Sequence, residues 1–352
     1  MSGDVPIRRR RRAVLALTSV AFTLVALELV IRAFDAARGR SWNARTSWYW
    51  MFERDPYQGF RGRANVEFDF GPDGVYRHNG DGFRDRRELR DVATVEDRRL
   101  IICVGESSTY GSGAPDVKDT YPARLEAHLR RLSSDDRWIV YNAGVPAYSS
   151  YETVALLQLR LLKLHPEAVV MMNLRNDVEY SARVLDERTG YSDLPLRSAP
   201  LHATHVNELA MRSSLVGFIA TRFANAQSEA IRETQRRVRA PISPRGRSFY
   251  VDNLSRAALL CKRAGSRLLV VDQPIYDSGQ PRERQQATVD LRATMEATCR
   301  GLGVTVLAAD RPLHESGFTF PGEVHLGSDG YNKLAELLAS QILSILPTSR
   351  HR

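Results

Sequence analysis

A serine between two glycines follows the first strongly apolar run of the main part of the chain. The run is residues 99–104 (RLIICV), and the segment after it reads Gly105-Glu106-Ser107-Ser108-Thr109-Tyr110-Gly111. A hydroxyl on a glycine-flanked turn between a strand and a helix is a common way to present a serine nucleophile. The G-x-S-x-G motif is not matched, because Thr109 occupies its second glycine position. Taken alone, a helix N-cap is the simpler interpretation of Ser107.

Three further segments place a glycine, an amide and an imidazole beside predicted elements. Gly144 follows the run 138–142, and a glycine N–H can approach an anion closely. Asn176 follows the run 168–173, and its side-chain amide could donate to an oxyanion. His325 precedes the last helical segment, from which it could reach a serine at a sheet edge. Individually these residues fit a turn glycine, a helix cap and a surface histidine.

Apolar runs alternate with helical periodicity from residue 99 onward. The runs predict five strands, and the periodic segments between them predict helices; the strands are 99–104, 138–142, 168–173, 267–272 and 304–308, and the helices 121–132, 151–164, 249–264, 283–300 and 328–345. This alternation predicts an α/β fold with a five-stranded parallel sheet sandwiched by helices. Sites in such sheets lie at the carboxyl ends of the strands, where Ser107, Gly144 and Asn176 fall.

The order of these residues resembles that of the SGNH (GDSL-type) hydrolases, especially the membrane-anchored bacterial members. The resemblance covers residues 98–345 and rests on GESSTYGSG, DTYPARLEAHL, YNAGVPAYSSYE and EVHLGSDGYNKLAELL, with Asn79–Asp85 (NGDGFRD) in the preceding segment. It implies a flavodoxin-like hydrolase fold, with Ser107 as nucleophile and His325 as base. The N–H groups of Ser107 and Gly144 and the amide of Asn176 would form the oxyanion hole. No metal or organic cofactor is implied.

The sequence departs from the family pattern at three positions. Gly-Glu-Ser replaces Gly-Asp-Ser, and Leu174 stands where the family has a glycine. Gly322 occupies the position, three residues before His325, at which the family places the triad aspartate. Either Glu323 or a backbone carbonyl could orient the imidazole instead, and the sequence does not choose between them.

The N-terminus has the composition of a membrane anchor. Arg8–Arg12 precede an apolar stretch, Ala13–Ile31, long enough to cross a bilayer, and Glu28 and Arg32 near its end are spaced to pair. We predict a cytoplasmic segment at 1–12, a transmembrane signal anchor at 13–34, an irregular lead-in at 35–97, and a hydrolase domain at 98–348 with an insertion at about 178–248. The catalytic domain would then be periplasmic on the bacterial inner membrane. A cleaved signal peptide and a buried core helix are the alternatives.

Composition excludes several other classes of protein. The chain has 352 residues, of which 43% are hydrophobic and 26% charged, with a mean hydropathy of −0.34, so it is neither disordered nor a multi-span transporter. The net charge of +9 is concentrated at the N-terminus, where residues 1–40 hold 8 Arg and 3 acidic residues, so nucleic-acid binding is not expected. Cys103 fits a buried thiol, while Cys261 and Cys299 could pair.

Three functions fit this sequence. The first is a membrane-tethered ester hydrolase acting on acylated glycan or lipid through Ser107 and His325. The second is a polysaccharide O-acyltransferase that uses the same serine and passes the acyl group to a sugar hydroxyl. The third is a non-catalytic glycan-binding or assembly protein, supported by Gly322 in place of the acid. Protein partners and oligomeric state are not indicated by the sequence.

Overall fold

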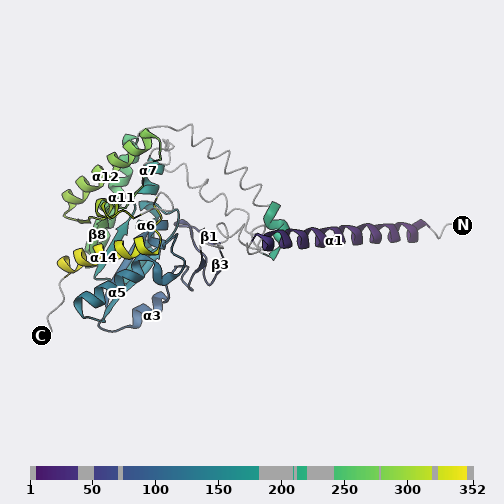
Figure 1. Ribbon diagram of the computed structural model, residues 1–352, viewed down its shortest axis with the longest axis horizontal. Helices are drawn as coiled ribbons and strands as arrows, with labels where there is room; N and C mark the ends of the chain where they lie inside the picture. The colour runs from purple at the N-terminus through teal and green to yellow at the C-terminus, as the bar shows by residue number, and fades with distance from the viewer. Residues whose placement is uncertain are drawn as a thin grey trace.

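The computed structural model describes residues 5–38, 51–69, 74–181, 209, 212–219, 242–276, 279–318 and 324–346. The first element is a long helix, α1 (Val5–Ala37), which projects from the rest of the chain (Figure 1). Its segment Arg9–Ala37 is long and apolar enough to cross a membrane, with a hydropathy of 2.4 and 0% of the apolar window buried. By length and composition this segment is a candidate membrane span or signal sequence.

Helix α1 makes a polar contact with the segment 212–219 near its C-terminal end. The expected pair forms, with Arg32 Nε 2.7 Å from Glu28 Oε1. The Glu28 carboxylate also accepts the Ser213 hydroxyl and the backbone N–H groups of Ser214 and Leu215, each at 2.8 Å. Glu28 thus supplies acceptors to backbone N–H groups that the first turn of a helix cannot satisfy internally.

The main domain contains the predicted parallel sheet. Its strands are β5 (Arg99–Gly105), β6 (Trp138–Gly144), β7 (Ala168–Met172), β8 (Arg267–Val271) and β9 (Thr305–Leu307). They pair in the order β6-β5-β7-β8-β9, and every pair is parallel. This is the doubly wound order expected of a flavodoxin-like sheet. All residues of β5, β6 and β7 are buried, as both faces of the sheet are covered.

Helices cover the two faces of the sheet in two groups (Figure 1). One face packs on α6 (Ser150–Leu156), α11 (Pro244–Arg263) and α12 (Arg282–Leu302), and the other on α5 (Tyr121–Ser133) and α14 (Ser328–Ile345). Alternate residues of β5 serve the two cores: Ile102 faces the first group, and Ile101 and Cys103 face the second. The shorter elements are α3 (Leu89–Thr94), α4 (Ser107–Tyr110), the 3₁₀ turn Val117–Asp119, α7 (Arg175–Ser181) and α13 (Asp310–Glu315).

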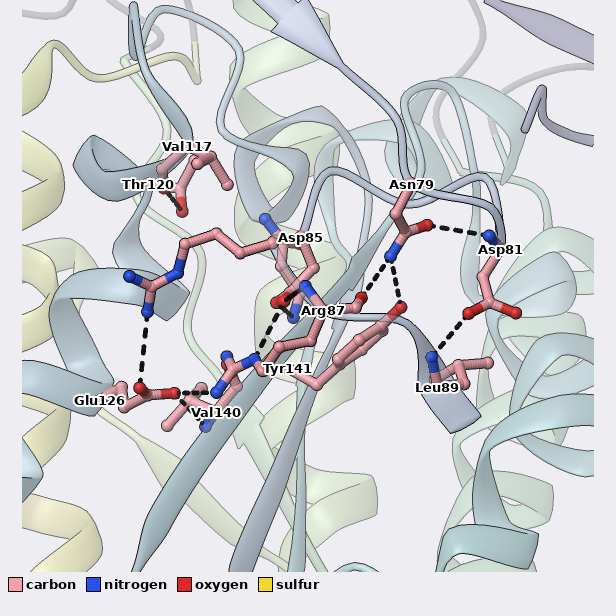
Figure 2. Close-up of polar contacts among 12 residues, drawn as sticks. Asn79, Asp81, Asp85, Arg87, Leu89, Val117, Thr120, Glu126, Val140 and Tyr141 are labelled. Atoms are coloured by element: carbon pink, nitrogen blue, oxygen red, sulfur yellow. Dashed lines mark hydrogen bonds and ion pairs between the residues drawn. The ribbon is translucent and has the colours of Figure 1, made fainter. Parts of the chain in front are cut away.

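The lead-in forms two antiparallel hairpins and a polar clasp against β6. The hairpins are β1 (Phe52–Asp55) with β2 (Gly59–Gly62), and β3 (Glu67–Asp69) with β4 (Val75–Arg77). Figure 2 shows the clasp, in which Asn79 Nδ2 donates to the Tyr141 hydroxyl at 2.9 Å and Arg87 bridges Glu126 (2.7 Å) and the carbonyl oxygen of Val140 (2.8 Å). The segment Asn79–Asp85, singled out in the sequence, therefore fixes the lead-in to the sheet.

One expected helix differs from the structure, and one open alternative is decided by it. The predicted helix 151–164 is not continuous: α6 ends at Leu156 and is followed by a π-helix, Leu157–Leu161, and a 3₁₀ turn, Leu162–Leu164, that ends at His165 with φ 50°. Cys261 and Cys299 do not pair, because each packs as a free buried thiol in the core between α11, α12 and the sheet. Most of the expected insertion at 178–248 lies outside the described residues.

Candidate active site

The predicted site residues lie close together at the point where the strand order of the sheet reverses. After β5 the chain crosses to β6 on one side, and β7 then pairs with β5 on the other. Ser107 begins α4, one residue beyond the end of β5, and Asn176 lies in the first turn of α7, which two residues separate from β7. Crevices at such switch points, outside the carboxyl ends of the strands, are where ligands bind in open α/β sheets.

Ser107 and His325 form the central contact. Ser107 Oγ lies 2.8 Å from His325 Nε2, although the two residues are 218 positions apart. Ser107, Asn176 and His325 are each partly exposed, while the residues on both sides of each of them are buried. These three side chains are therefore accessible to solvent, while their neighbours in the chain are not.

The backbone before Ser107 requires a glycine. Gly105 has φ 149°, and a Cβ there would collide with the Met172 carbonyl oxygen on β7 and lie 2.6 Å from Thr109 Oγ1. The missing side chain lets α4 start immediately at the end of β5, which places Ser107 at the sheet edge.

Asn176 is held by its neighbours on three sides. Its side-chain Nδ2 donates to the Tyr148 carbonyl at 2.8 Å, and its backbone N–H donates to Glu106 Oε2 at 3.1 Å. The next residue, Asp177, accepts the N–H (2.9 Å) and hydroxyl (2.6 Å) of Ser150 at the start of α6. An amide nitrogen carries two hydrogens, so the contact with Tyr148 orients Nδ2 and leaves a second N–H for a substrate.

The contacts of Gly144 differ from the role expected for it. Its N–H, predicted as an oxyanion donor, donates to Asn142 Oδ1 at 3.0 Å. A Cβ at Gly144 would collide with the Tyr110 backbone nitrogen and lie 2.6 Å from the Thr109 carbonyl carbon. The structure therefore explains this glycine by the close packing of α4 on the end of β6.

The environment of His325 favours its neutral form. Burial and the nearby Arg175 guanidinium lower the pKa of the imidazole below its ordinary value of 6.5. Among the described residues, no hydrogen-bond partner is present for Nδ1 of His325. Gly322, which stands at the family's triad-acid position, and Glu323, its candidate replacement, lie outside the described residues. The described site is thus a Ser–His pair, with neutral His325 able to accept a proton.

Three polar residues beside the site were not predicted from the sequence. Glu106 is fully buried, and burial raises the pKa of its carboxyl to about 8. Ser108 donates to the Val324 carbonyl at 2.9 Å, and Gln273 donates to Ser108 Oγ at 3.1 Å. Gln273 lies two residues beyond the end of β8. The rule that sites lie at the carboxyl ends of parallel strands could therefore have identified it. Glu106 could have been identified by its position next to the serine.

Comparisons with known proteins identify the family of this chain. The family model described as "GDSL-like Lipase/Acylhydrolase family" matches residues 103–333. A search of curated proteins finds no match. Similar solved structures include the lipase/acylhydrolase from Enterococcus faecalis, with 15% identity and a TM-score of 0.47 over 72% of this chain and 100% of that one. Others are a lipolytic protein of the G-D-S-L family from Veillonella parvula (14%, 0.42, 70% and 98%) and the acetyl xylan esterase AlAXEase (10%, 0.44, 69% and 99%).

The family match covers most of the chain. It begins within β5, ahead of Ser107, and ends within α14, beyond His325, so it includes every predicted site residue. This chain therefore belongs to the GDSL-like lipase/acylhydrolase family and is an ester-bond hydrolase.

Proposed function

We propose that this protein is a membrane-tethered serine esterase whose catalytic domain lies outside the cytoplasm and removes acyl groups from glycan or lipid. The observation that carries the proposal is the 2.8 Å separation between Ser107 Oγ and His325 Nε2. A hydroxyl at this distance from a neutral imidazole nitrogen can lose its proton while it attacks a carbonyl carbon.

The reaction would proceed in two halves. His325 Nε2 accepts the Ser107 proton as Oγ bonds to the ester carbon, and the carbonyl oxygen becomes anionic. Collapse of this intermediate breaks the bond to the alcohol oxygen, which takes the proton from His325. A water molecule then gives a proton to His325 and bonds to the acyl carbon. Oγ leaves, regains its proton and releases the acid.

Two donors are placed to stabilise the anionic oxygen. The Ser107 N–H begins α4, so it has no acceptor within that helix, and Asn176 Nδ2 is oriented by the Tyr148 carbonyl. Removing one donor of this kind costs roughly 100-fold to 1,000-fold in kcat. Since the Gly144 N–H already donates to Asn142, we assign the oxyanion to Ser107 and Asn176.

The tether and the choice of substrate rest on α1. The arginines 8–12 favour a cytoplasmic N-terminus, and the apolar segment after them would carry the following domain across the membrane. A site held at the outer surface of the inner membrane meets acylated lipids and acylated envelope glycans. These substrates match a partly exposed serine that attacks ester carbonyls.

A serine-directed fluorophosphonate probe tests the chemistry. Ser107 should become covalently labelled, and labelling should be lost in Ser107→Ala and in His325→Ala, because the serine hydroxyl is a weak nucleophile without its base. Ser108→Ala should still be labelled. Absence of labelling in folded wild-type protein would contradict the proposal and favour a non-catalytic glycan-binding role.

Acetate release separates hydrolysis from transfer. Purified protein is incubated with an acetylated polysaccharide, with and without an added sugar acceptor. Esterase activity predicts free acetate in both samples. Acetyl transfer to the acceptor with little free acetate would instead identify an O-acyltransferase.

A further inference from the structure

Gln273 is a buried side chain at the carboxyl end of β8 that contacts two other loops of the site. It has 0% exposure, and its Oε1 accepts the backbone N–H groups of Leu174 (3.0 Å) and Arg175 (2.9 Å). Its Nε2 donates to Ser108 Oγ at 3.1 Å. Two N–H donors face Oε1, so the orientation of the amide is determined by its partners.

The contacts of Gln273 continue through Ser108 to the histidine loop. Ser108 is buried, and its hydroxyl donates to the Val324 carbonyl at 2.9 Å while accepting from Gln273. Val324 directly precedes His325, Ser108 directly follows Ser107, and Arg175 directly precedes Asn176. One connected set of hydrogen bonds therefore joins the immediate neighbours of all three site residues.

We propose that Gln273 is a positioning residue, which acts through Ser108 and the start of α7 to hold Ser107, His325 and Asn176 in their mutual geometry. The proposal rests on the function proposed above, in which these three residues act together. It deepens that function by naming the side chain that fixes their spacing.

The physical basis is the sensitivity of catalysis to small displacements. A misplacement of about 1 Å can cost roughly 100-fold in rate. Ser107, His325 and Asn176 come from three segments far apart in the sequence, and among these three described residues the hydrogen bond joins Ser107 with His325. The buried amide adds links from the end of β8 to the other segments, and a polar group left unpaired there would be costly because it is buried.

Replacing the amide by an apolar side chain or by a carboxyl tests different parts of the proposal. Gln273→Leu removes both the acceptor and the donor and should lower kcat about 10-fold to 100-fold, with KM changed less than about 3-fold. Gln341→Leu is the control. Gln341, a partly exposed residue of α14, also bridges backbone groups, accepting from Ala308 N (2.8 Å) and donating to Ala308 O (2.9 Å), just after the edge strand β9. The control should keep wild-type kcat.

The pH profile of Gln273→Glu provides a readout that a purely structural role would not change. The charged groups near this amide include Glu106, Arg175 and Asp177. Arg292 of α12 donates to the Gln273 carbonyl oxygen at 2.9 Å and pairs with Asp272 and Asp310, and the pKa of Asp272 is raised by burial to about 6 in the wild type and the variant alike. A new carboxyl beside Glu106 should share a proton with it at low pH, which preserves the geometry. As pH rises and both ionise, repulsion should separate the loops. The ratio of variant to wild-type kcat should therefore fall between pH 5 and pH 8.

A double-mutant cycle tests whether Gln273 acts through Ser108. If it does, the combined Gln273→Leu and Ser108→Ala variant should lose less kcat than the product of the two single losses. Thermal unfolding of each variant identifies those that remain folded at the assay temperature. Wild-type kcat in folded Gln273→Leu, a flat pH ratio in Gln273→Glu, or full additivity in the cycle would overturn the assignment. Absence of esterase activity in folded wild-type protein would instead contradict the proposed function itself.

Discussion

The hydroxyls of Ser107 and Ser108 point to different partners in the same loop around His325. Ser107 Oγ lies 2.8 Å from the imidazole Nε2, whereas Ser108 Oγ donates to the carbonyl of Val324, one residue earlier. The two serines therefore hold the histidine loop at two adjacent points. Ser108→Ala should keep the nucleophile but loosen its base, so it should be labelled by a fluorophosphonate more slowly than wild-type protein.

The acid limb of the pH–activity profile should report the ionisation of His325. Catalysis requires the neutral imidazole, and burial together with Arg175 lowers the pKa of His325 below 6.5. kcat/KM should therefore rise with pH, with a midpoint below 6.5. Steady-state assays from pH 4 to pH 7 measure it, and a midpoint above 6.5 would show that an unseen acid stabilises the imidazolium.

The alkaline limb of the pH–activity profile should report the ionisation of Glu106. Its carboxyl has a pKa raised to about 8 by burial, so it is mostly neutral at pH 7 and becomes charged above pH 8. A negative charge next to the Asn176 backbone N–H opposes the developing oxyanion, so activity should decline above pH 8. Glu106→Gln should abolish that decline. Glu336→Gln, at a carboxylate on α14 that pairs with Lys333, should retain it.

His78 should make the folded state sensitive to acid. It is buried, with Nδ1 2.9 Å from the Arg63 carbonyl and Nε2 2.8 Å from the Tyr110 hydroxyl, and burial lowers its pKa from 6.5 to about 4. Between these values the unfolded chain binds a proton that the folded protein does not, so stability falls as pH decreases. Urea unfolding should show about 2 kcal/mol of this loss between pH 6.5 and 4.5.

A glutamine at the same position provides the comparison. His78→Gln can donate to the Arg63 carbonyl and accept from Tyr110, but it has no proton to bind in this range. Its free energy of unfolding should depend less on pH than that of wild-type protein. An unchanged slope would assign the acid sensitivity to other groups.

Gly144→Ala should test the packing of α4 on β6. The added Cβ would lie 2.6 Å from the Thr109 carbonyl carbon and collide with the Tyr110 nitrogen, so backbone must move. We expect a loss of about 1–3 kcal/mol, the usual cost of overpacking, with reduced activity because α4 carries Ser107. Gly301→Ala, at a position in α12 with nothing within 4 Å of its Cβ, should be neutral or stabilising. Equal effects at the two glycines would exclude a steric cause.

The orientation of the chain in the membrane can be tested with a C-terminal tag. If Met1–Arg12 are cytoplasmic and the chain beyond residue 34 is outside, protease added to spheroplasts should digest the tag. A tag that resists the protease until the cells are lysed would place the hydrolase domain in the cytoplasm.

The sheet was predictable because its signals are local. Runs such as 138–142 are continuous and apolar, which suits strands buried on both faces, and their order along the chain constrains the topology to few possibilities. Ser107, Asn176 and His325 were selected because their order along the chain resembles the family pattern, and each lies within four residues of the end of a strand or the start of a helix. Their positions depend on strand and helix ends more than on distant contacts.

The parts that were missed depend on contacts between distant residues. Gln273 lies next to Ser108 only because β8 is two places from β5 in the sheet, and no sequence pattern encodes the 3.1 Å contact. Gly144 was assigned from its place after a strand, but whether its N–H faces a substrate or Asn142 depends on a side-chain conformation. The break in the helix after Leu156 is likewise absent from the leucine periodicity of 151–164.

The contact of Glu28 with the segment 212–219 bears on how the enzyme can be prepared. Deleting residues 1–38 would remove a candidate membrane span and would also leave the Ser213 hydroxyl and the N–H groups of Ser214 and Leu215 without their acceptor. The Arg212 carbonyl would lose its contact with Arg32 as well. A truncated chain would therefore differ from the full-length protein at these contacts, so full-length protein is the appropriate material for kinetic work.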